Sequence, residues 1–207
     1  MAALAAGNAV IAKSAEQTPL VAAFAVRLMY QAGIPADVLH FLPGSGASAG
    51  AALTGAEGIA GVAFTGTVET ARLIAKSLAA KPGPLAPFIA ETGGQNVMIV
   101  DSSALLEQAV ADALTSAFSS AGQRCSCLRV VFVQEEIAAA FIAKLDGALQ
   151  EIEVGDPILL ATDVGPLIDA DALAQRAHGA RSDVTRRCAD VKRYRVRLLF
   201  FAASFRN

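Results

Sequence analysis

The chain has 207 residues, of which 54% are hydrophobic and 17% charged, which is enough apolar material for one large core or two small ones. Residues 1–175 carry 8 Lys/Arg against 17 Asp/Glu, whereas residues 176–207 carry 9 against 2. The acidic body excludes a nucleic-acid-binding surface in this segment and favours small-molecule partners, and no run reaches the roughly 18 apolar residues that a membrane helix needs.

Apolar runs alternate with helical stretches along the first 175 residues. Strands are predicted at 8–13, 38–44, 61–66 and 128–134, with two more around the Gly-Gly turn within 88–100; helices are predicted at 18–33, 46–54, 67–80, 103–120 and 135–150. In the helix at 18–33, Thr18 is placed as N-cap, Pro19 in the first turn and Gly33 as the stop. The alternation predicts an α/β fold with a parallel sheet covered on both faces.

The Pro/Gly-rich segment near 81–95 is the expected domain boundary. Residues 176–207 differ from the rest: they are basic and show neither a helical stripe nor bounded strands. One interpretation is a solvated basic extension. The other is loss of the coding frame, which the codon usage of the final thirty or so codons would test.

The segment "SSAGQRCSCLR" at 119–129 places Cys125 and Cys127 one residue apart. A metal site is disfavoured because the two histidines, His40 and His178, lie in distant stretches. A disulfide between the two cysteines would close a small, strained ring. A nucleophile and a small buried residue remain, and composition alone favours the buried residue.

Glu91, in "ETGGQN", supplies the chemistry that a reactive Cys125 would need. A thiolate is nucleophilic where positive charge or dipoles favour it, and a carboxylate beside a flexible Gly-Gly turn can deprotonate a thiol or a water. Cysteine and glutamate without a partnered histidine suit attack on an aldehyde followed by hydrolysis of a thioester.

Six blocks in order and spacing resemble the NAD-dependent aldehyde dehydrogenase superfamily: "GNAVIAKSAEQTPL", "FLPGSGASAGAAL", "GVAFTGTVETAR", "ETGGQNVMIVD", "SAGQRCSCLRVVFVQ" and "VGDPILLATDVGPLID". Within it, "ETGGQN" and "SAGQRCS" are most similar to the 1-pyrroline-5-carboxylate (L-glutamate γ-semialdehyde) dehydrogenase domain of bacterial bifunctional proline-utilisation proteins. The resemblance implies a partial Rossmann-like NAD-binding domain at 1–93, a partial α/β catalytic domain at 94–175 and an atypical basic tail at 176–207.

For the chemistry, the resemblance implies that Cys125 is the nucleophile, with its own backbone N–H as an oxyanion donor. It implies that Glu91 activates the hydrolytic water and that Ser126 helps to hold the substrate carboxylate. Cys127 stands where a small residue is usual, so a packing role is expected.

For the cofactor, the resemblance implies NAD. Lys13 and Glu16 would bind the adenosine ribose hydroxyls, and a carboxylate there favours NAD over its phosphorylated form. Without the neighbouring blocks, the same pair would be interpreted as an exposed ion pair. Three further residues complete the implied cofactor site: Gly46 near the adenine, Gly66 with Thr67 at the pyrophosphate, and Gly93 near the nicotinamide.

The family chain is much longer, so the sequence is expected to be an internal fragment with exposed apolar faces and poor solubility. The implied second oxyanion asparagine, the glutamate that grips the nicotinamide ribose and the segment that makes the family homo-oligomeric are not found in it. The implied reaction is oxidation of L-glutamate γ-semialdehyde to glutamate in proline catabolism, in a reducing cytoplasm, with a small aldehyde as substrate and no metal. The alternatives are another semialdehyde or aldehyde dehydrogenase, or a non-catalytic remnant; the chain alone is expected to be inactive.

Overall fold

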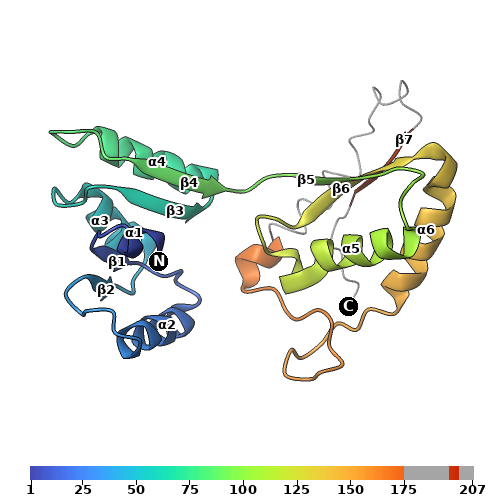
Figure 1. The fold of residues 1–207 in the computed structure, drawn as a ribbon, viewed down its shortest axis with the longest axis horizontal. Helices are drawn as coiled ribbons and strands as arrows, with labels where there is room; N and C mark the ends of the chain where they lie inside the picture. The colour runs from blue at the N-terminus through green and yellow to red at the C-terminus, as the bar shows by residue number, and fades with distance from the viewer. Residues whose placement is uncertain (175–195, 201–207) are drawn as a thin grey trace. The chain divides into compact units, whose positions relative to one another are not determined.

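The structure is a computed structural model that describes residues 1–174 and 196–200. The chain divides into two compact units, unit 1 from Met1 to Thr92 and unit 2 from Gly93 to Asn207 (Figure 1). The division falls in the Gly-Gly turn that follows Glu91. Parallel strand pairs joined through helices occur in both units, so the predicted α/β class is confirmed.

Unit 1 consists of two separate pairs of parallel strands and the helices between them. Its elements are α1 (Ala2–Ala5), β1 (Val10–Ala12), α2 (Pro19–Gln31), β2 (Leu39–Phe41), the π-helix η1 (Gly46–Gly50), α3 (Ala51–Gly55), β3 (Val62–Gly66), α4 (Val68–Ala79) and β4 (Phe88–Thr92). Strand β1 pairs with β2, and β3 pairs with β4. Each pair therefore brings the carboxyl ends of two strands to one edge, where the loops that follow them meet.

The two longer helices of unit 1 begin in different ways. Thr67 occupies the N-cap of α4, and its hydroxyl accepts a hydrogen bond from the backbone N–H of Thr70. Thr18 occupies the N-cap of α2, but its side chain makes no capping bond, so the expected cap is present in position only. Pro19 fills the first turn of α2 as predicted, and Gly33 follows the helix with a φ of 96°.

Unit 2 is built around the longest strand of the described residues. Its elements are β5 (Asn96–Val100), α5 (Leu106–Phe118), the 3₁₀-helix η2 (Ser119–Gly122), β6 (Leu128–Gln134), α6 (Glu135–Gln150) and β7 (Val196–Phe200). Residues of α5, β6 and α6 form the centre of its core, among them Ala113, Val131, Val133, Ala138 and Phe141, each 0% exposed. This core fixes β6, and with it the cysteine segment that leads into β6.

Two expectations about the sheets are wrong. The described strands form three small sheets, and within the described residues helices cover the sheet of unit 2 on one face only. Alternate residues of β5 point to opposite faces, so Val100 is buried against the helices while Val97 is 55% and Ile99 78% exposed. The tail also contains a bounded strand, since β7 pairs antiparallel with β6; the remainder of the expected tail lies outside the described residues.

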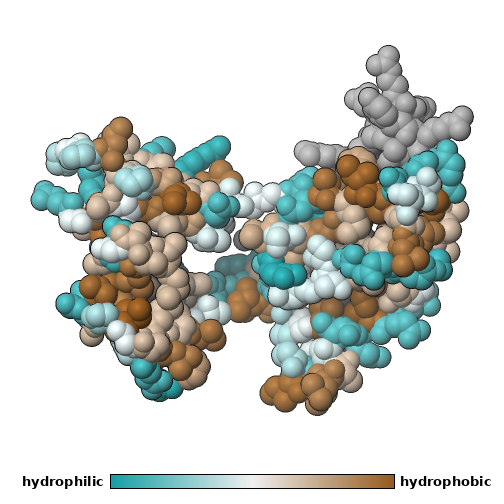
Figure 2. All heavy atoms as spheres, in the orientation of Figure 1, coloured by the Kyte–Doolittle hydropathy of each residue, from teal (hydrophilic) through white to brown (hydrophobic). Residues whose placement is uncertain are grey.

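Large apolar side chains are exposed on both units, as expected (Figure 2). On α2, Leu20 is 83%, Val21 72% and Phe24 52% exposed. In unit 2, Ile158 and Leu160 protrude from the loop between Val154 and Val164. Within the part of the chain that is described, no helix combines the length and the apolar character needed to cross a membrane.

Candidate active site

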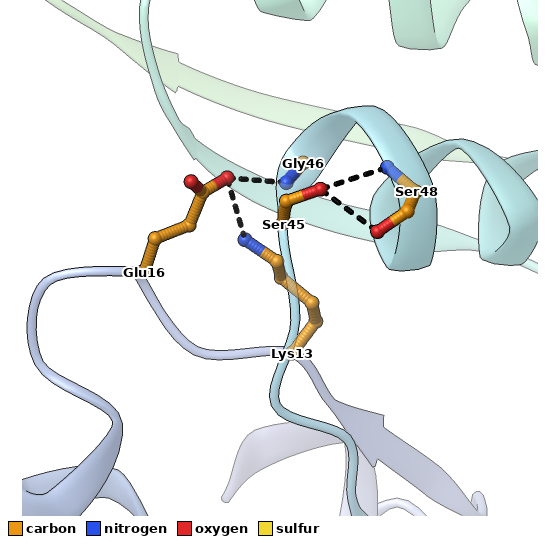
Figure 3. A network of polar contacts seen from close by, with 5 residues as sticks. All are labelled: Lys13, Glu16, Ser45, Gly46 and Ser48. Atoms are coloured by element: carbon orange, nitrogen blue, oxygen red, sulfur yellow. Dashed lines mark hydrogen bonds and ion pairs between the residues drawn. The ribbon is translucent and has the colours of Figure 1, made fainter.

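The loops that follow β1 and β2 are joined through one carboxylate. Glu16 accepts a hydrogen bond from the backbone N–H of Gly46, and its Oε1 lies 3.9 Å from the Lys13 ammonium (Figure 3). Ser45 fixes the start of η1, because its hydroxyl accepts from the Ser48 N–H at 3.0 Å. The predicted trio of Lys13, Glu16 and Gly46 is therefore brought together at the edge where β1 and β2 end.

The carboxyl ends of β3 and β4 bring three more predicted residues to one edge of unit 1. Glu91 lies opposite Thr65, and Thr92 lies opposite Gly66, which Thr67 follows directly. Gly66, Thr67 and Glu91 are all exposed. Gly66 has a packing constraint of its own, because a Cβ at this position would lie 2.4 Å from Cζ of Phe64.

The N-terminus of α4 already carries a carboxylate. Hydrogen bonds to its own backbone N–H and to the Thr67 side chain lower the pKa of Glu69. A carboxylate is favourable at a helix N-terminus because the dipole and the free N–H groups there are positive. The Glu69 carboxylate therefore already offsets part of the positive potential at the start of α4.

Left-handed backbone at non-glycine residues marks the entry to the cysteine segment. Ser120 has φ 57° and Ala121 φ 53°, followed by Gly122 at φ 64°. Such residues persist only where the surroundings determine them strongly. Here Arg129 donates to the Gly122 carbonyl oxygen at 2.7 Å, and the Gln123 amide donates to the Ser120 oxygen at 3.1 Å while accepting from the Ile168 N–H at 2.9 Å.

The two cysteines of this segment differ sharply in environment. Both are free thiols, but Cys125 is exposed and Cys127 is 1% exposed, which confirms the expected packing role of Cys127. The Cys127 N–H donates to the Arg124 oxygen at 3.2 Å, and the Cys127 sulfur lies 3.3 Å from the Arg124 nitrogen, which donates to it. This tight turn presents Cys125 and the exposed Ser126 at its tip.

Asn96, which the sequence interpretation did not single out, holds this turn through two hydrogen bonds. The Asn96 amide nitrogen donates to the carbonyl oxygen of Cys125 at 2.6 Å and to that of Cys127 at 3.0 Å. The available signal was its position, an amide side chain two residues after the Gly-Gly pair and at the start of a strand.

Gly93 and the two residues at the tip of the turn belong to unit 2, whereas Glu91 belongs to unit 1. Gly93 is exposed, and nothing lies within 4 Å of an added Cβ. Among the described residues there is no group of three His, Cys, Asp or Glu side chains that could hold a metal ion.

A profile of the aldehyde dehydrogenase family matches residues 1–191, a range that runs beyond the resemblance recognised in the sequence. The chain belongs to the aldehyde dehydrogenase family. Members of the family oxidise small aldehydes with NAD or its phosphorylated form as hydride acceptor.

Individual relatives within the family show which of its members the chain is similar to. The chain is 55% identical over 174 residues to the bifunctional protein PutA of Klebsiella aerogenes, covering 83% of this chain and 13% of PutA. It is 35% identical over 175 residues to 1-pyrroline-5-carboxylate dehydrogenase of Geobacillus kaustophilus, covering 83% of this chain and 34% of that protein. The chain thus spans a minor part of the length of either relative.

The solved structures agree with this placement in the aldehyde dehydrogenase family. The crystal structure of the D779W mutant of Bradyrhizobium japonicum proline utilization A matches with a TM-score of 0.83 and 54% identity. The match covers 88% of this chain and 19% of that chain.

Proposed function

We propose that these residues contribute to an active site that oxidises L-glutamate γ-semialdehyde, the open form of 1-pyrroline-5-carboxylate, to glutamate in proline catabolism. The observation that carries the proposal is the contrast between an exposed Cys125 thiol at the tip of an anchored turn and its buried neighbour Cys127. Identity of 55% to PutA and 35% to a 1-pyrroline-5-carboxylate dehydrogenase supports the substrate class.

In the proposed reaction the Cys125 thiolate adds to the aldehyde carbon, and the carbonyl oxygen becomes an oxyanion. Cys125 N–H is suited to stabilise that oxyanion, because within the described residues it makes no hydrogen bond. Loss of hydride from the thiohemiacetal carbon leaves a thioester on Cys125. Glu91 then takes a proton from water as the water attacks the thioester, which releases glutamate and restores the thiol.

NAD, when bound, supplies the hydride acceptor. The Glu16 carboxylate, which accepts from the Gly46 N–H and lies beside Lys13, is the proposed acceptor for the two vicinal hydroxyls of the adenosine ribose. A 2′-phosphate at the same place would face a negative charge, so NAD is favoured over its phosphorylated form. Gly66, Thr67 and Gly93 complete the proposed cofactor contacts, with residues 1–93 as the cofactor-binding part and 94–175 as the catalytic part.

Ser126 is the proposed contact to the substrate carboxylate. It is exposed beside Cys125, so a hydroxyl donor lies one residue from the reacting sulfur. A site that hydrogen-bonds a polar group of its substrate discriminates strongly against analogues that lack it. Glutamate semialdehyde should therefore be preferred over an uncharged aldehyde of similar length, which would distinguish this function from that of a general aldehyde dehydrogenase.

The test is a transplant. Residues 1–174 of this chain replace the matching residues of Klebsiella PutA, and NADH formation from glutamate semialdehyde is followed in the chimaera. Cys125→Ala should abolish turnover, whereas the matched variant Cys127→Ala should retain it. Equal loss in both, or in neither, contradicts the assignment of the nucleophile.

The chain on its own is proposed to be inactive, since the implied second oxyanion asparagine and nicotinamide-ribose glutamate are not found among its residues. Turnover by the purified 207-residue polypeptide would contradict that part of the proposal. A chimaera that folds, binds NAD and oxidises only uncharged aldehydes would favour a different aldehyde dehydrogenase activity.

A further inference from the structure

We infer that Asn96 is a positioning residue for the nucleophile: its amide fixes the turn that carries Cys125. The inference rests on the proposed role of Cys125 and adds a residue to it. Asn96 lies at the first position of β5, outside the set of residues proposed above to contact substrate or cofactor.

The orientation of the Asn96 side chain follows from its two partners. Both partners are main-chain carbonyl oxygens, at 2.6 Å and 3.0 Å, and a carbonyl can only accept. The NH₂ group of the amide must therefore face Cys125 and Cys127, with one hydrogen for each oxygen. One side chain thus holds two peptide groups of the turn, Cys125–Ser126 and Cys127–Leu128.

These bonds determine where the remaining N–H groups of the turn point. In a trans peptide the C=O and the following N–H point in opposite directions. Because the Cys125 oxygen is directed at Asn96, the Ser126 N–H is directed away from it. The Arg124 oxygen accepts from the Cys127 N–H inside the turn, so the Cys125 N–H points outward, where an oxyanion could be bound.

Asn96 can serve as an anchor because β5 is itself held by the core. Val100, at the other end of the strand, is 3% exposed, and β5 is paired along its length with β6. The register shifts next to Asn96: Asn96 pairs with Leu128, but Val97 pairs with Val130, which leaves Arg129 as an extra residue. A bulge of this kind redirects side chains locally, and here the Arg129 side chain reaches the Gly122 oxygen at the entry to the same segment.

The expected effect on the reaction is large because misplacing a reacting group by about 1 Å can reduce a rate by about 100-fold. Asn96→Asp is close in shape but loses both donors and sets a negative charge against two carbonyl oxygens. Asn96→Ser keeps one donor. The neighbouring Gln95 is exposed and makes no hydrogen bond within the described residues, so Gln95→Ala is the matched control.

In the PutA chimaera, the rate of the first NADH turnover is measured per titrated reactive thiol, with the dissociation constant of NAD measured alongside. We expect a graded loss, from about 3-fold in Asn96→Ser to between about 10- and 100-fold in Asn96→Asp, with NAD binding and the Gln95→Ala control unchanged. Misfolded protein exposes thiols that would also be titrated, so the rate is in addition referred to the number of NAD-binding sites.

The purified chain provides an independent measurement. Iodoacetamide should label Cys125 and spare Cys127, and Asn96→Asp should raise the labelling rate of Cys127 by about 30-fold, since two hydrogen bonds of about 1 kcal/mol each no longer close the turn. The inference is overturned if Asn96→Asp changes neither the normalised rate of the first NADH turnover nor the labelling rate of Cys127. If instead Cys125→Ala remains active, the proposed nucleophile is wrong, and that result is separate from the behaviour of Asn96.

Discussion

The guanidinium of Arg129 donates to the main-chain oxygen of Gly122 at 2.7 Å, and Gly122 is the last of three consecutive residues with left-handed backbone. Arg129 is also the extra residue of the β5–β6 bulge. The hydrogen bond between Arg129 and Gly122 thus connects the bulge to the left-handed turn. The path of the chain into Cys125 is fixed by partners in β6 and beyond it, rather than by the preferences of the residues in the turn.

Replacing Ser120 by glycine should therefore stabilise unit 2. Left-handed backbone costs a residue with a Cβ about 1–2 kcal/mol, and the greater freedom of unfolded glycine offsets roughly half of that. Ser120 is exposed; its carbonyl accepts a hydrogen bond, but within the described residues its side chain makes none. We expect Ser120→Gly to raise the free energy of unfolding by about 0.5–1 kcal/mol in urea melts, with Ser120→Ala as control near zero. Equal stability of the glycine and alanine variants would show that the turn is not strained at this residue.

Gly66→Ala tests the contact with the Phe64 ring. A Cβ placed 2.4 Å from Cζ of Phe64 forces the ring to move, and overpacking of this kind typically costs about 1–3 kcal/mol. Combining Gly66→Ala with Phe64→Leu should recover most of the loss, because the smaller side chain vacates the clashing position. A double-mutant cycle by denaturant unfolding measures the coupling. Additive losses would mean that the glycine is required for another reason.

The ion pair between Glu107 and Lys144, at 2.7 Å, should make a small contribution to stability that depends on pH. The hydrogen bond to Lys144 is the main cause that lowers the pKa of Glu107. A lowered carboxyl pKa contributes stability above the unfolded pKa, and that contribution is lost as pH falls through the folded pKa. The Tm difference between wild type and Glu107→Gln should be positive at pH 7 and vanish in acid below that folded pKa.

The Tm difference between wild type and Glu107→Gln should shrink in 1 M salt. Both side chains of the Glu107–Lys144 pair are substantially exposed, so salt screens their attraction. Lys144→Met provides the matched partner variant. A Tm difference that stays constant across the acid range would assign the effect to helix propensity instead of to the pair.

Glu16→Gln should change the cofactor preference of the PutA chimaera. The neutral amide retains hydrogen bonding to the ribose but no longer repels a 2′-phosphate, so the preference for NAD over NADP in kcat/KM should fall by about 10-fold. Glu57→Gln, another exposed acid of unit 1, is the control. An unchanged preference would place cofactor selection elsewhere in the protein.

Several elements could be predicted because local signals and the final packing agree. The apolar, β-branched run in "LRVVFVQ" followed by an acidic first turn marks both β6 and α6 with the bounds that the structure shows. Thr67 caps α4 through its own hydroxyl, so a local interaction sets the start of that helix. Cys125 and Glu91 were conspicuous because a cysteine beside an arginine, and a carboxylate close to paired glycines, are uncommon in so apolar a chain.

Other features depend on contacts between residues far apart in sequence. The left-handed backbone at Ser120 and Ala121 is imposed by Arg129 and Gln123, and neither residue's own preference indicates it. Thr18 likewise shows that a residue can occupy the N-cap position of a helix without making the capping hydrogen bond. The pairing of β7 with β6 joins residues far apart in sequence, which no local pattern reports.

Strand β6 has a neighbour along both sides, β5 on one and β7 on the other, from Val130 to Val133. A polypeptide that stopped at residue 175 would leave one side of β6 with a bare ladder of amide and carbonyl groups. Such a ladder recruits strands from other molecules, so shortening the chain to its enzyme-like portion is expected to promote edge-to-edge self-assembly.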